Sequence, residues 1–558
     1  MILDSAERIK EYTERGYWGQ KTLIDYFKER VNEEPDRVCL VDPPNKQQLV
    51  GLTPERVTYR ELDRAVDATA ESFLRRGIQK DDIIIVQLPN CWELAMLYLA
   101  ITKAGALISP VPMQWRESEL RYIGELTEAR AFITIEEFHG FKHGEMGKKL
   151  QTQLHNLKHI ITLPELREMA KGEITGKLNE VNIDANDIFT LCWTSGTETE
   201  PKGCPLSHNN WIFQGTVLPA ETGEIKKGDT ILTAGPLVNM ASVGTTLILW
   251  LTLGGTFVLH HPFDPVVWMQ QMIEEKVNYT LLVPAVVNAI AKHPLVDKFD
   301  LSAVRSIALG SAPPSLWSAQ EFKRRWGIEI ANVWGMNEGP GFICGPEDAP
   351  DLEKRVKGFP QYGKRGIEWK NKVLSAAVES KLVDPETGEE VTEVGDVGEL
   401  LYKGPNVISG YFRQPDFTKT AFDEDGFFHT GDLFQIEEGN FVSFVDRKKD
   451  IVIRGGFNIS TQEVENMLVG HPKVLDVAAV AMPDERLGER GCVYVFPREG
   501  EKITLDELTS FMKEKGIAIY KLPERLEVVK ELPRNPVGKI LKATLRKDIE
   551  NKIKSETV

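Results

Sequence analysis

Strand-like and helix-like segments alternate along most of the chain, and this alternation limits the folds open to it. The pattern is clear in residues 56–110, where the strand-like DIIIVQLP and ALISPVP flank the helix-like CWELAMLYLAITKAG. It returns around residues 231–260, 278–309 and 328–334. Parallel sheets covered by helices produce this alternation, so the sequence predicts an α/β fold.

The pattern of strand-like and helix-like segments changes twice towards the C-terminus. Residues 381–448 contain short strand-like runs separated by Gly, Pro and Asp turns, whereas residues 449–558 mix strands with helices that open on capping-box patterns. The chain has 558 residues, more than the roughly 250–300 that a single core sustains. We therefore predict an N-terminal domain at 1–448, with a β-rich part at about 381–448, and a C-terminal domain at 449–558.

The composition excludes several classes of partner. The formal net charge of −16 argues against nucleic acid or an anionic membrane surface, since both attract basic faces. Six widely spaced cysteines form no CxxC pair and fit a reducing cytoplasm. The charged N-terminus shows no secretory signal, and the most apolar run, residues 246–259, is too short to span a bilayer. We expect a cytoplasmic protein without a transmembrane segment, and the sequence leaves a homo-oligomer open.

The segment LCWTSGTETEPKG (191–203) has the parts of a phosphate-binding loop. It offers hydroxyls, a glycine that lets backbone N–H groups approach an anion, and a mobile positive charge. These are supplied by Thr194, Ser195, Thr197, Gly196 and Lys202. It is not a Walker A motif, because Lys202 precedes Gly203. Alone, it reads equally well as a polar surface turn.

Four further motifs follow this loop in order, and the set resembles a known family. They are WGMNE (334–338), HTGDL (429–433), DRKKDIVIRGG (446–456) and RNPVGK (534–539). Together they resemble the adenylate-forming superfamily: acyl-CoA synthetases, adenylation domains of peptide synthetases and firefly-type luciferases. Within this superfamily, the motifs are most similar to those of short- and medium-chain or alicyclic acyl-CoA synthetases. The resemblance implies two α/β subdomains and a small β-barrel-like subdomain in the N-terminal domain, with a hinged α+β C-terminal domain.

The resemblance implies roles for residues in each motif. Lys539, Lys202 and Glu338 would be catalytic, and Glu338 with Thr194 would hold Mg²⁺, a hard cation that prefers oxygen ligands. Asp432 would accept from both ribose hydroxyls, with Arg447 assisting. The remaining residues implied to bind ATP or AMP are Ser195, Gly196, Thr197, Gly310, Ser311, Ala312, Asn332, Trp334, Gly335, Met336 and Asn337.

The same resemblance implies an acyl pocket, a hinge and a path for coenzyme A. Lys449 would be the hinge on which the C-terminal domain turns, and Gly455 with Gly456 would leave room for the pantetheine arm. The acyl-pocket residues would be Asn239, Met240, Val243 and Gly335. An apolar side chain at position 240 indicates an acyl group without phenolic hydroxyls, and Gly335 leaves space beyond acetate.

The implied activity is an AMP-forming acyl-CoA synthetase that uses ATP, Mg²⁺ and coenzyme A. It would activate a short- or medium-chain, alicyclic or aromatic acid, a fatty acid included. No carrier domain follows Lys539, which favours a free-standing enzyme. Two alternatives stay open: an aryl-acid ligase that loads a separate carrier protein, and a nucleotide-binding protein without turnover. The second is motivated by Glu198, Thr199 and Asn337, where the family usually has Thr, Gly and Thr.

Overall fold

The structure is a computed structural model that describes residues 1–194, 200–364, 366–454, 457–484, 486–535 and 539–556. The chain divides into two compact units. The large unit contains residues 1–194, 201–379 and 402–428, and the small unit is built mainly from residues 380–401 and 429–558. The domain border expected at residue 449 stays a prediction.

The large unit contains a six-stranded sheet in the order β6-β5-β3-β4-β7-β8. Its strands are β3 (Ile83–Val86), β4 (Leu107–Pro110), β5 (Ala131–Thr134), β6 (His159–Thr162), β7 (Ile188–Trp193) and β8 (Gly203–Ser207). All neighbouring pairs are parallel except β7 with β8, which are antiparallel. The segment that resembles a phosphate loop therefore connects two adjacent strands at one edge of the sheet.

The second sheet of the large unit has eight strands in the order β14-β13-β12-β11-β9-β10-β1-β2. They are β1 (Val38–Val41), β2 (Arg56–Thr58), β9 (Thr230–Thr233), β10 (Thr256–Leu259), β11 (Tyr279–Leu282), β12 (Ser306–Leu309), β13 (Glu329–Gly335) and β14 (Gly341–Cys344). The six central strands are parallel, and β2 and β14 pair antiparallel at the two edges. The α/β prediction is confirmed.

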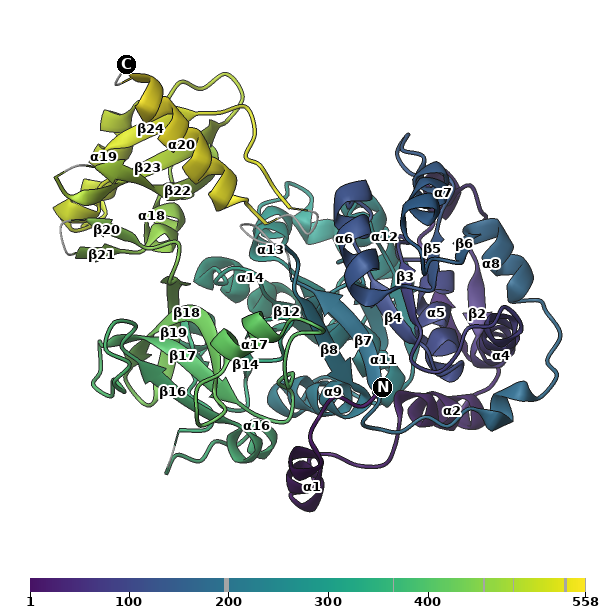
Figure 1. The fold of residues 1–558 in the computed structure, drawn as a ribbon. Helices are drawn as coiled ribbons and strands as arrows, with labels where there is room; N and C mark the ends of the chain where they lie inside the picture. The colour runs from purple at the N-terminus through teal and green to yellow at the C-terminus, as the bar shows by residue number, and fades with distance from the viewer. Residues whose placement is uncertain (195–199, 365, 455–456, 485, 536–538, 557–558) are drawn as a thin grey trace. The chain divides into compact units, whose positions relative to one another are not determined.

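Helices flank both sheets (Figure 1). The first group is α1 (Ala6–Glu14), α2 (Leu23–Glu33), α3 (Lys46–Val50), α4 (Tyr59–Arg75), α5 (Trp92–Lys103), α6 (Glu117–Thr127), α7 (His143–Gln153), α8 (Leu163–Met169) and α9 (His208–Thr222). The second is α10 (Met240–Ser242), the π-helix η2 (Val243–Leu247), α11 (Ile248–Leu253), α12 (Pro265–Glu274), α13 (Pro284–Ala291), α14 (Leu316–Trp326), α15 (Leu352–Lys357), α16 (Lys372–Ala377) and α17 (Pro415–Ala421). Short 3₁₀ turns are η1 (Lys177–Glu180) and η3 (Val296–Lys298).

The small unit holds two mainly antiparallel sheets. The first has the order β19-β18-β17-β16, from β16 (Glu379–Val383), β17 (Val397–Lys403), β18 (Phe428–Glu437) and β19 (Phe441–Arg447). The second has the order β21-β20-β23-β22, with β24 beside β23. Its elements are β20 (Val452–Arg454), β21 (Phe457–Ile459), α18 (Thr461–Leu468), β22 (Val474–Asp484), β23 (Gly488–Pro497), α19 (Leu505–Glu514), η4 (Ile519–Lys521), β24 (Arg525–Val528) and α20 (Lys542–Glu556).

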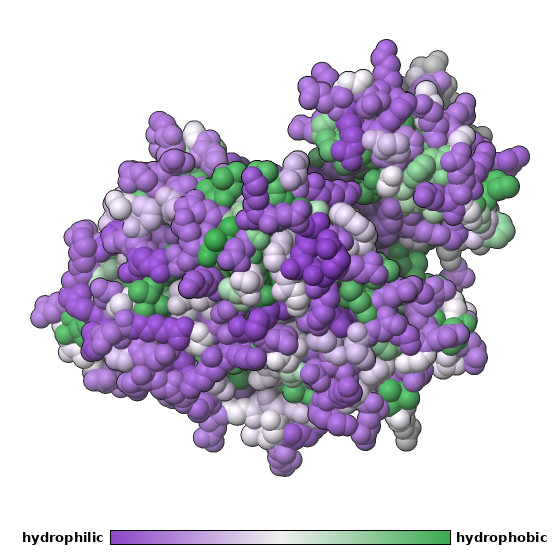
Figure 2. All heavy atoms as spheres, turned by 180° about the vertical axis from the view of Figure 1, so that it is seen from behind, coloured by the Kyte–Doolittle hydropathy of each residue, from purple (hydrophilic) through white to green (hydrophobic). Residues whose placement is uncertain are grey.

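The surface is mainly hydrophilic and the cysteines are buried. On the face seen in Figure 2, hydrophilic side chains predominate and apolar ones gather in separate patches. All six cysteines lie among the described residues, and each is a buried thiol outside any disulfide. Within the described part of the chain, no helix has both the length and the apolar character to cross a membrane.

A buried ion cluster joins the two sheets of the large unit. Lys46 Nζ lies 2.7 Å from Asp42 Oδ2 and 2.9 Å from Glu93 Oε2, and all three side chains are at most 1% exposed. Asp42 directly follows β1 of the eight-stranded sheet, whereas Glu93 opens α5, which follows β3 of the six-stranded sheet. Arg167 extends the cluster, bonding Glu93 and both carboxylate oxygens of Glu55. The cluster thus fixes one sheet against the other.

Replacing Lys46 with alanine is expected to lower the free energy of unfolding by about 3–5 kcal/mol, because the buried Asp42 loses its counter-charge and Glu93 keeps only Arg167. Urea denaturation followed by tryptophan fluorescence measures this. The matched control is Lys142→Ala, which removes an ion pair with Glu145 whose side chains are 59% and 69% exposed, and should change stability by less than about 1 kcal/mol. Equal stability of the two variants would contradict the assignment.

Candidate active site

The phosphate-loop segment leaves the sheet at the end of β7 and returns at the start of β8. Thr194 and Lys202 close its stem: the Thr194 N–H donates to the Lys202 carbonyl at 3.0 Å, and the Lys202 N–H donates to Thr194 Oγ1 at 3.1 Å. The Lys202 ammonium lies 5.0 Å from the ring centre of Tyr411 and 4.6 Å from that of Phe417. The predicted ligands Ser195, Gly196 and Thr197, with Glu198 and Thr199, lie outside the described residues.

The WGMNE motif forms the tight turn between β13 and β14. The Gly339 N–H donates to the Met336 carbonyl and the Met336 N–H to the Pro340 carbonyl, each at 3.1 Å. This turn presents Glu338, whose side chain accepts a 2.9 Å hydrogen bond from the Tyr411 hydroxyl. Glu338 is only 6% exposed, so its carboxylate lies in a sheltered position.

Asn337 connects the ends of the two sheets. Its Nδ2 donates to the Trp193 carbonyl at 2.7 Å, and its Oδ1 accepts from the Met240 N–H at 2.8 Å. Trp193 is the last residue of β7, and Met240 opens α10. The resemblance implies nucleotide binding at Asn337, but in the structure both amide groups bond to the protein. The asparagine that replaces the family's usual threonine thus connects β7 to α10.

The other predicted nucleotide-binding residues of the large unit follow β12 or lie on β13. Gly310, Ser311 and Ala312 come directly after β12, and Ser311 has a φ of +73°, a conformation that few non-glycine residues adopt. Asn332 is 4% exposed and its Nδ2 donates to the Arg355 carbonyl at 3.2 Å, so its amide is turned towards α15. Trp334 and Gly335 end β13.

Three of the four predicted acyl-pocket residues lie where α10 continues into the π-helix η2, and the fourth, Gly335, ends β13. Asn239 caps α10, its Oδ1 accepting from the Ser242 N–H at 3.1 Å. Met240 is 7% exposed and Val243, the first residue of the π-helix, is fully buried. A Cβ at Gly335 would meet no atom closer than 3.4 Å. The set thus combines two buried apolar side chains with one amide and one glycine, and it contains no charged side chain.

In the small unit, the predicted ribose ligands are partners across an antiparallel pair. Asp432 of β18 faces Arg447 of β19, with Asp432 Oδ1 3.7 Å from Arg447 Nε. Asp432 is 7% exposed. The predicted hinge residue Lys449 is exposed just after β19, and the predicted path residues Gly455 and Gly456 lie outside the described residues.

Lys539 is joined to Asn535 by two hydrogen bonds. The Lys539 N–H donates to Asn535 Oδ1 at 2.8 Å, and the Asn535 N–H donates to the Lys539 carbonyl at 2.7 Å. Burial, followed by the charge of Arg447, lowers the pKa of Lys539 to about 7, while Asp432 acts in the opposite direction. The small unit thus brings the predicted catalytic lysine and the predicted ribose ligands together.

The donor set of the large unit suits Mg²⁺ brought in by phosphates. Among the described residues, no three His, Cys, Asp or Glu side chains gather into a metal-binding group. Glu338 alone supplies a sheltered carboxylate, and Thr194 supplies a hydroxyl. Mg²⁺ is commonly held by one or two carboxylates together with substrate phosphates and water, so this donor set fits the ion.

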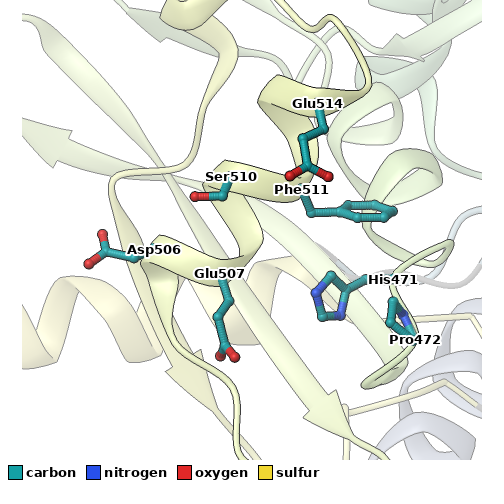
Figure 3. Close-up of a pocket in the computed structure, with 7 residues that line it drawn as sticks. All are labelled: His471, Pro472, Asp506, Glu507, Ser510, Phe511 and Glu514. Atoms are coloured by element: carbon teal, nitrogen blue, oxygen red, sulfur yellow. The ribbon is translucent and has the colours of Figure 1, made fainter.

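A cavity of about 430 Å³ on the small unit is a different kind of site (Figure 3). It lies beside α19, where His471 and Phe511 are accompanied by the carboxylates Asp506, Glu507 and Glu514. None of the predicted site residues lines it. Its acidic lining repels phosphate and carboxylate groups, so this cavity is unsuited to an anionic nucleotide or acid.

Two features of the site are absent from the sequence analysis. Tyr411 contacts both Glu338 and Lys202, yet it lies about seventy residues from the first and over two hundred from the second. The two hydrogen bonds of Asn337 could not be predicted from the sequence either, because they depend on how the two sheets pack against each other. Only the Asn337 departure from the family motif signalled that this position was unusual.

Replacing Asn337 with Asp is expected to lower the free energy of unfolding by about 1–3 kcal/mol, because an acceptor then faces the Trp193 carbonyl. Urea denaturation measures the change. Asn466→Asp, on the exposed surface of α18, controls for the added charge and should stay within about 0.5 kcal/mol of the parent. A parental stability for the Asn337 variant would show that the bridge contributes nothing.

Lys539 is expected to titrate near pH 7, about three units below an ordinary lysine at about 10.4. Above that pH it is a neutral amine, the form that reacts with acetic anhydride. Competitive labelling followed by mass spectrometry gives the midpoint, with the exposed Lys10 as internal reference. Arg447→Gln should move the midpoint upwards, since it removes a positive neighbour. A midpoint near 10, or one indifferent to Arg447, would refute this.

Comparison with known proteins agrees with the geometry. Residues 27–412 match the family described as AMP-binding enzyme, and residues 463–539 match its C-terminal domain. The medium-chain fatty-acid–CoA ligase of Escherichia coli (strain K12) is 31% identical, with 98% of this chain and 94% of the relative covered. The 2,3-dihydroxybenzoate-AMP ligase of Bacillus subtilis (strain 168) is 31% identical, covering 98% and 97%.

Solved structures give the same fold. ATP-bound MatB from Rhodopseudomonas palustris has a TM-score of 0.80 at 24% identity, with 96% of this chain and 100% of the other covered. Apo MbtA from Mycobacterium smegmatis has a TM-score of 0.68 at 27% identity, with 98% of each covered. The resemblance seen in the motifs is confirmed, and so is the α/β architecture with a large and a small domain. The chain belongs to the AMP-binding enzyme family and is an adenylate-forming ligase.

Proposed function

We propose that this ligase is an AMP-forming acyl-CoA synthetase. It joins a short- or medium-chain, alicyclic or aromatic carboxylic acid to AMP, releasing pyrophosphate, and then transfers the acyl group to coenzyme A. The observation that carries the choice of acid is the apolar character of Met240 and Val243, two of the implied acyl-pocket residues, which are 7% and 0% exposed. Such side chains pack against alkyl or ring carbons but give a phenolic hydroxyl no partner.

The proposed first step needs charge compensation rather than a base. A carboxylic acid with a pKa near 4–5 is already ionised at pH 7, so its oxygen can attack the α-phosphorus directly while pyrophosphate leaves. The protein must orient the two anions and offset the charge that develops on the phosphoryl oxygens. Lys202 and Lys539 supply the positive groups, and Asp432 holds the ribose. Mg²⁺ bound with ATP would neutralise phosphate charge near Glu338.

The choice of coenzyme A as acceptor is supported by one of the two relatives named above. The Escherichia coli relative is a fatty-acid–CoA ligase, and it matches nearly the whole chain. The Bacillus subtilis relative is an acid-AMP ligase of equal identity, so a separate carrier protein is the competing acceptor. Position 240 lacks a polar side chain, which favours an acid without phenolic hydroxyls. This agrees better with the fatty-acid–CoA ligase than with the 2,3-dihydroxybenzoate-AMP ligase.

The test is acid-dependent exchange of pyrophosphate into ATP. Purified protein with ATP, Mg²⁺ and a panel of carboxylic acids should show exchange with medium-chain or cyclic acids and little with acetate. Added coenzyme A should then yield AMP and an acyl thioester. Exchange without thioester would direct the search to a carrier protein. No exchange with any acid would overturn the proposed reaction.

Replacing Lys539 with alanine is expected to slow acyl-AMP formation by about 10²- to 10³-fold, because a positive charge near the phosphorus is lost. Thioester formation from supplied acyl-AMP should be far less affected, since that step breaks no phosphorus–oxygen bond to pyrophosphate. Single-turnover assays of the two half-reactions separate the effects. Lys513→Ala, on the exposed face of α19, should leave both rates unchanged. Equal slowing of both steps would contradict the assigned role.

A further inference from the structure

The Glu338 backbone is fixed by residues 406–408 of the large unit. The Ile408 N–H donates to the Glu338 carbonyl at 2.9 Å, and Asn406 Nδ2 donates to the Gly339 carbonyl at 2.7 Å. Gly339 has a φ of +110°, and a Cβ there would lie 1.9 Å from the Asn406 carbonyl oxygen. Only glycine fits this approach, so the backbone that carries the acidic residue has one arrangement.

Tyr411, from the same segment, fixes the side chain of Glu338. Its hydroxyl donates to Glu338 Oε1 at 2.9 Å, and its own N–H donates to Thr418 Oγ1 at 2.9 Å, which ties it to α17. Tyr411 is 7% exposed. Tyr411 is therefore held at both its hydroxyl and its backbone N–H.

The ring of Tyr411 also meets the stem of the phosphate loop. The Lys202 ammonium lies 5.0 Å from its centre, within the range of a cation–π interaction. One side chain therefore contacts an acidic group carried by the eight-stranded sheet and a basic group carried by the six-stranded sheet. Two other buried tyrosines of this unit bond to backbone carbonyls instead: the Tyr59 hydroxyl donates to Gly255 at 3.1 Å and the Tyr98 hydroxyl to Leu237 at 2.7 Å.

We propose that Tyr411 is a positioning residue for adenylation: its hydroxyl aims the Glu338 carboxylate at the metal of Mg–ATP, and its ring orients Lys202 towards the phosphates. Tyr411 itself touches neither ATP nor the acid. The inference rests on the proposed function, because it assigns Glu338 and Lys202 to the same phosphates. Residues that orient a metal ligand in this way typically change metal affinity or activity 10- to 100-fold when they are replaced.

The direct test measures how strongly Mg²⁺ assists ATP binding. Isothermal titration of ATP, once with Mg²⁺ and once with EDTA, gives two dissociation constants whose ratio is the contribution of the metal. In Tyr411→Phe the ring remains but the hydroxyl is gone, so the ratio should fall 10- to 100-fold while ATP affinity in EDTA stays parental. Tyr411→Leu should in addition weaken ATP binding in EDTA, because Lys202 loses one of its two aromatic contacts and keeps only Phe417.

Tyr59→Phe is the matched control, since it also removes one buried hydroxyl from the large unit. Its ratio should be parental, and the KM for the acid should be parental in Tyr411→Phe. A parental ratio in Tyr411→Phe, with a loss of stability like that of Tyr59→Phe, would overturn the inference and leave the proposed reaction intact. A parent protein that shows neither Mg²⁺-assisted ATP binding nor acid-dependent exchange would overturn both.

Discussion

Two sheets that fold from different stretches of sequence must deliver their strand ends to one place, and the Asn337 amide makes that connection. It bonds the last carbonyl of β7 and the first N–H of α10, so the phosphate-loop stem, the acidic turn and the acyl surface share one junction. Farther from the site, the buried Lys46 cluster holds the same two sheets together. An error at either place would move phosphate groups relative to the acid, and catalysis by positioning tolerates little displacement.

Each unit carries its own set of charged candidate groups. The large unit offers Lys202 and the sheltered Glu338, both in contact with Tyr411, while the small unit offers Lys539 beside Arg447 and Asp432. The proposed reaction uses an acid that is ionised before it binds, so none of these groups has to remove a proton from it. Under the proposed function, Lys539 on the small unit would let a single chain present different groups to the two half-reactions, as the predicted hinge at Lys449 requires.

The sequence predicted much of the fold and the family, because both depend on local patterns. Alternating periodicity indicates parallel sheets wherever it occurs, and five ordered motifs identify the adenylate-forming family. Contacts between distant segments could not be predicted in this way. Nucleotide binding by Asn337 and Asn332 stays a prediction, but the motifs gave no sign that Asn337 joins two backbone groups or that Asn332 bonds to α15. Tyr411 lies outside the five motifs. Its partners are distant in the sequence, so only the folded structure shows these contacts.

The central claim is that an ionised acid attacks the α-phosphorus of ATP. Carboxylate labelled with ¹⁸O at both oxygens tests it directly, because the oxygen that forms the bond to phosphorus leaves with AMP when the thiol attacks. Mass spectrometry of the products should find one ¹⁸O in AMP and one in the acyl thioester. Unlabelled AMP, or ADP in its place, would contradict the account.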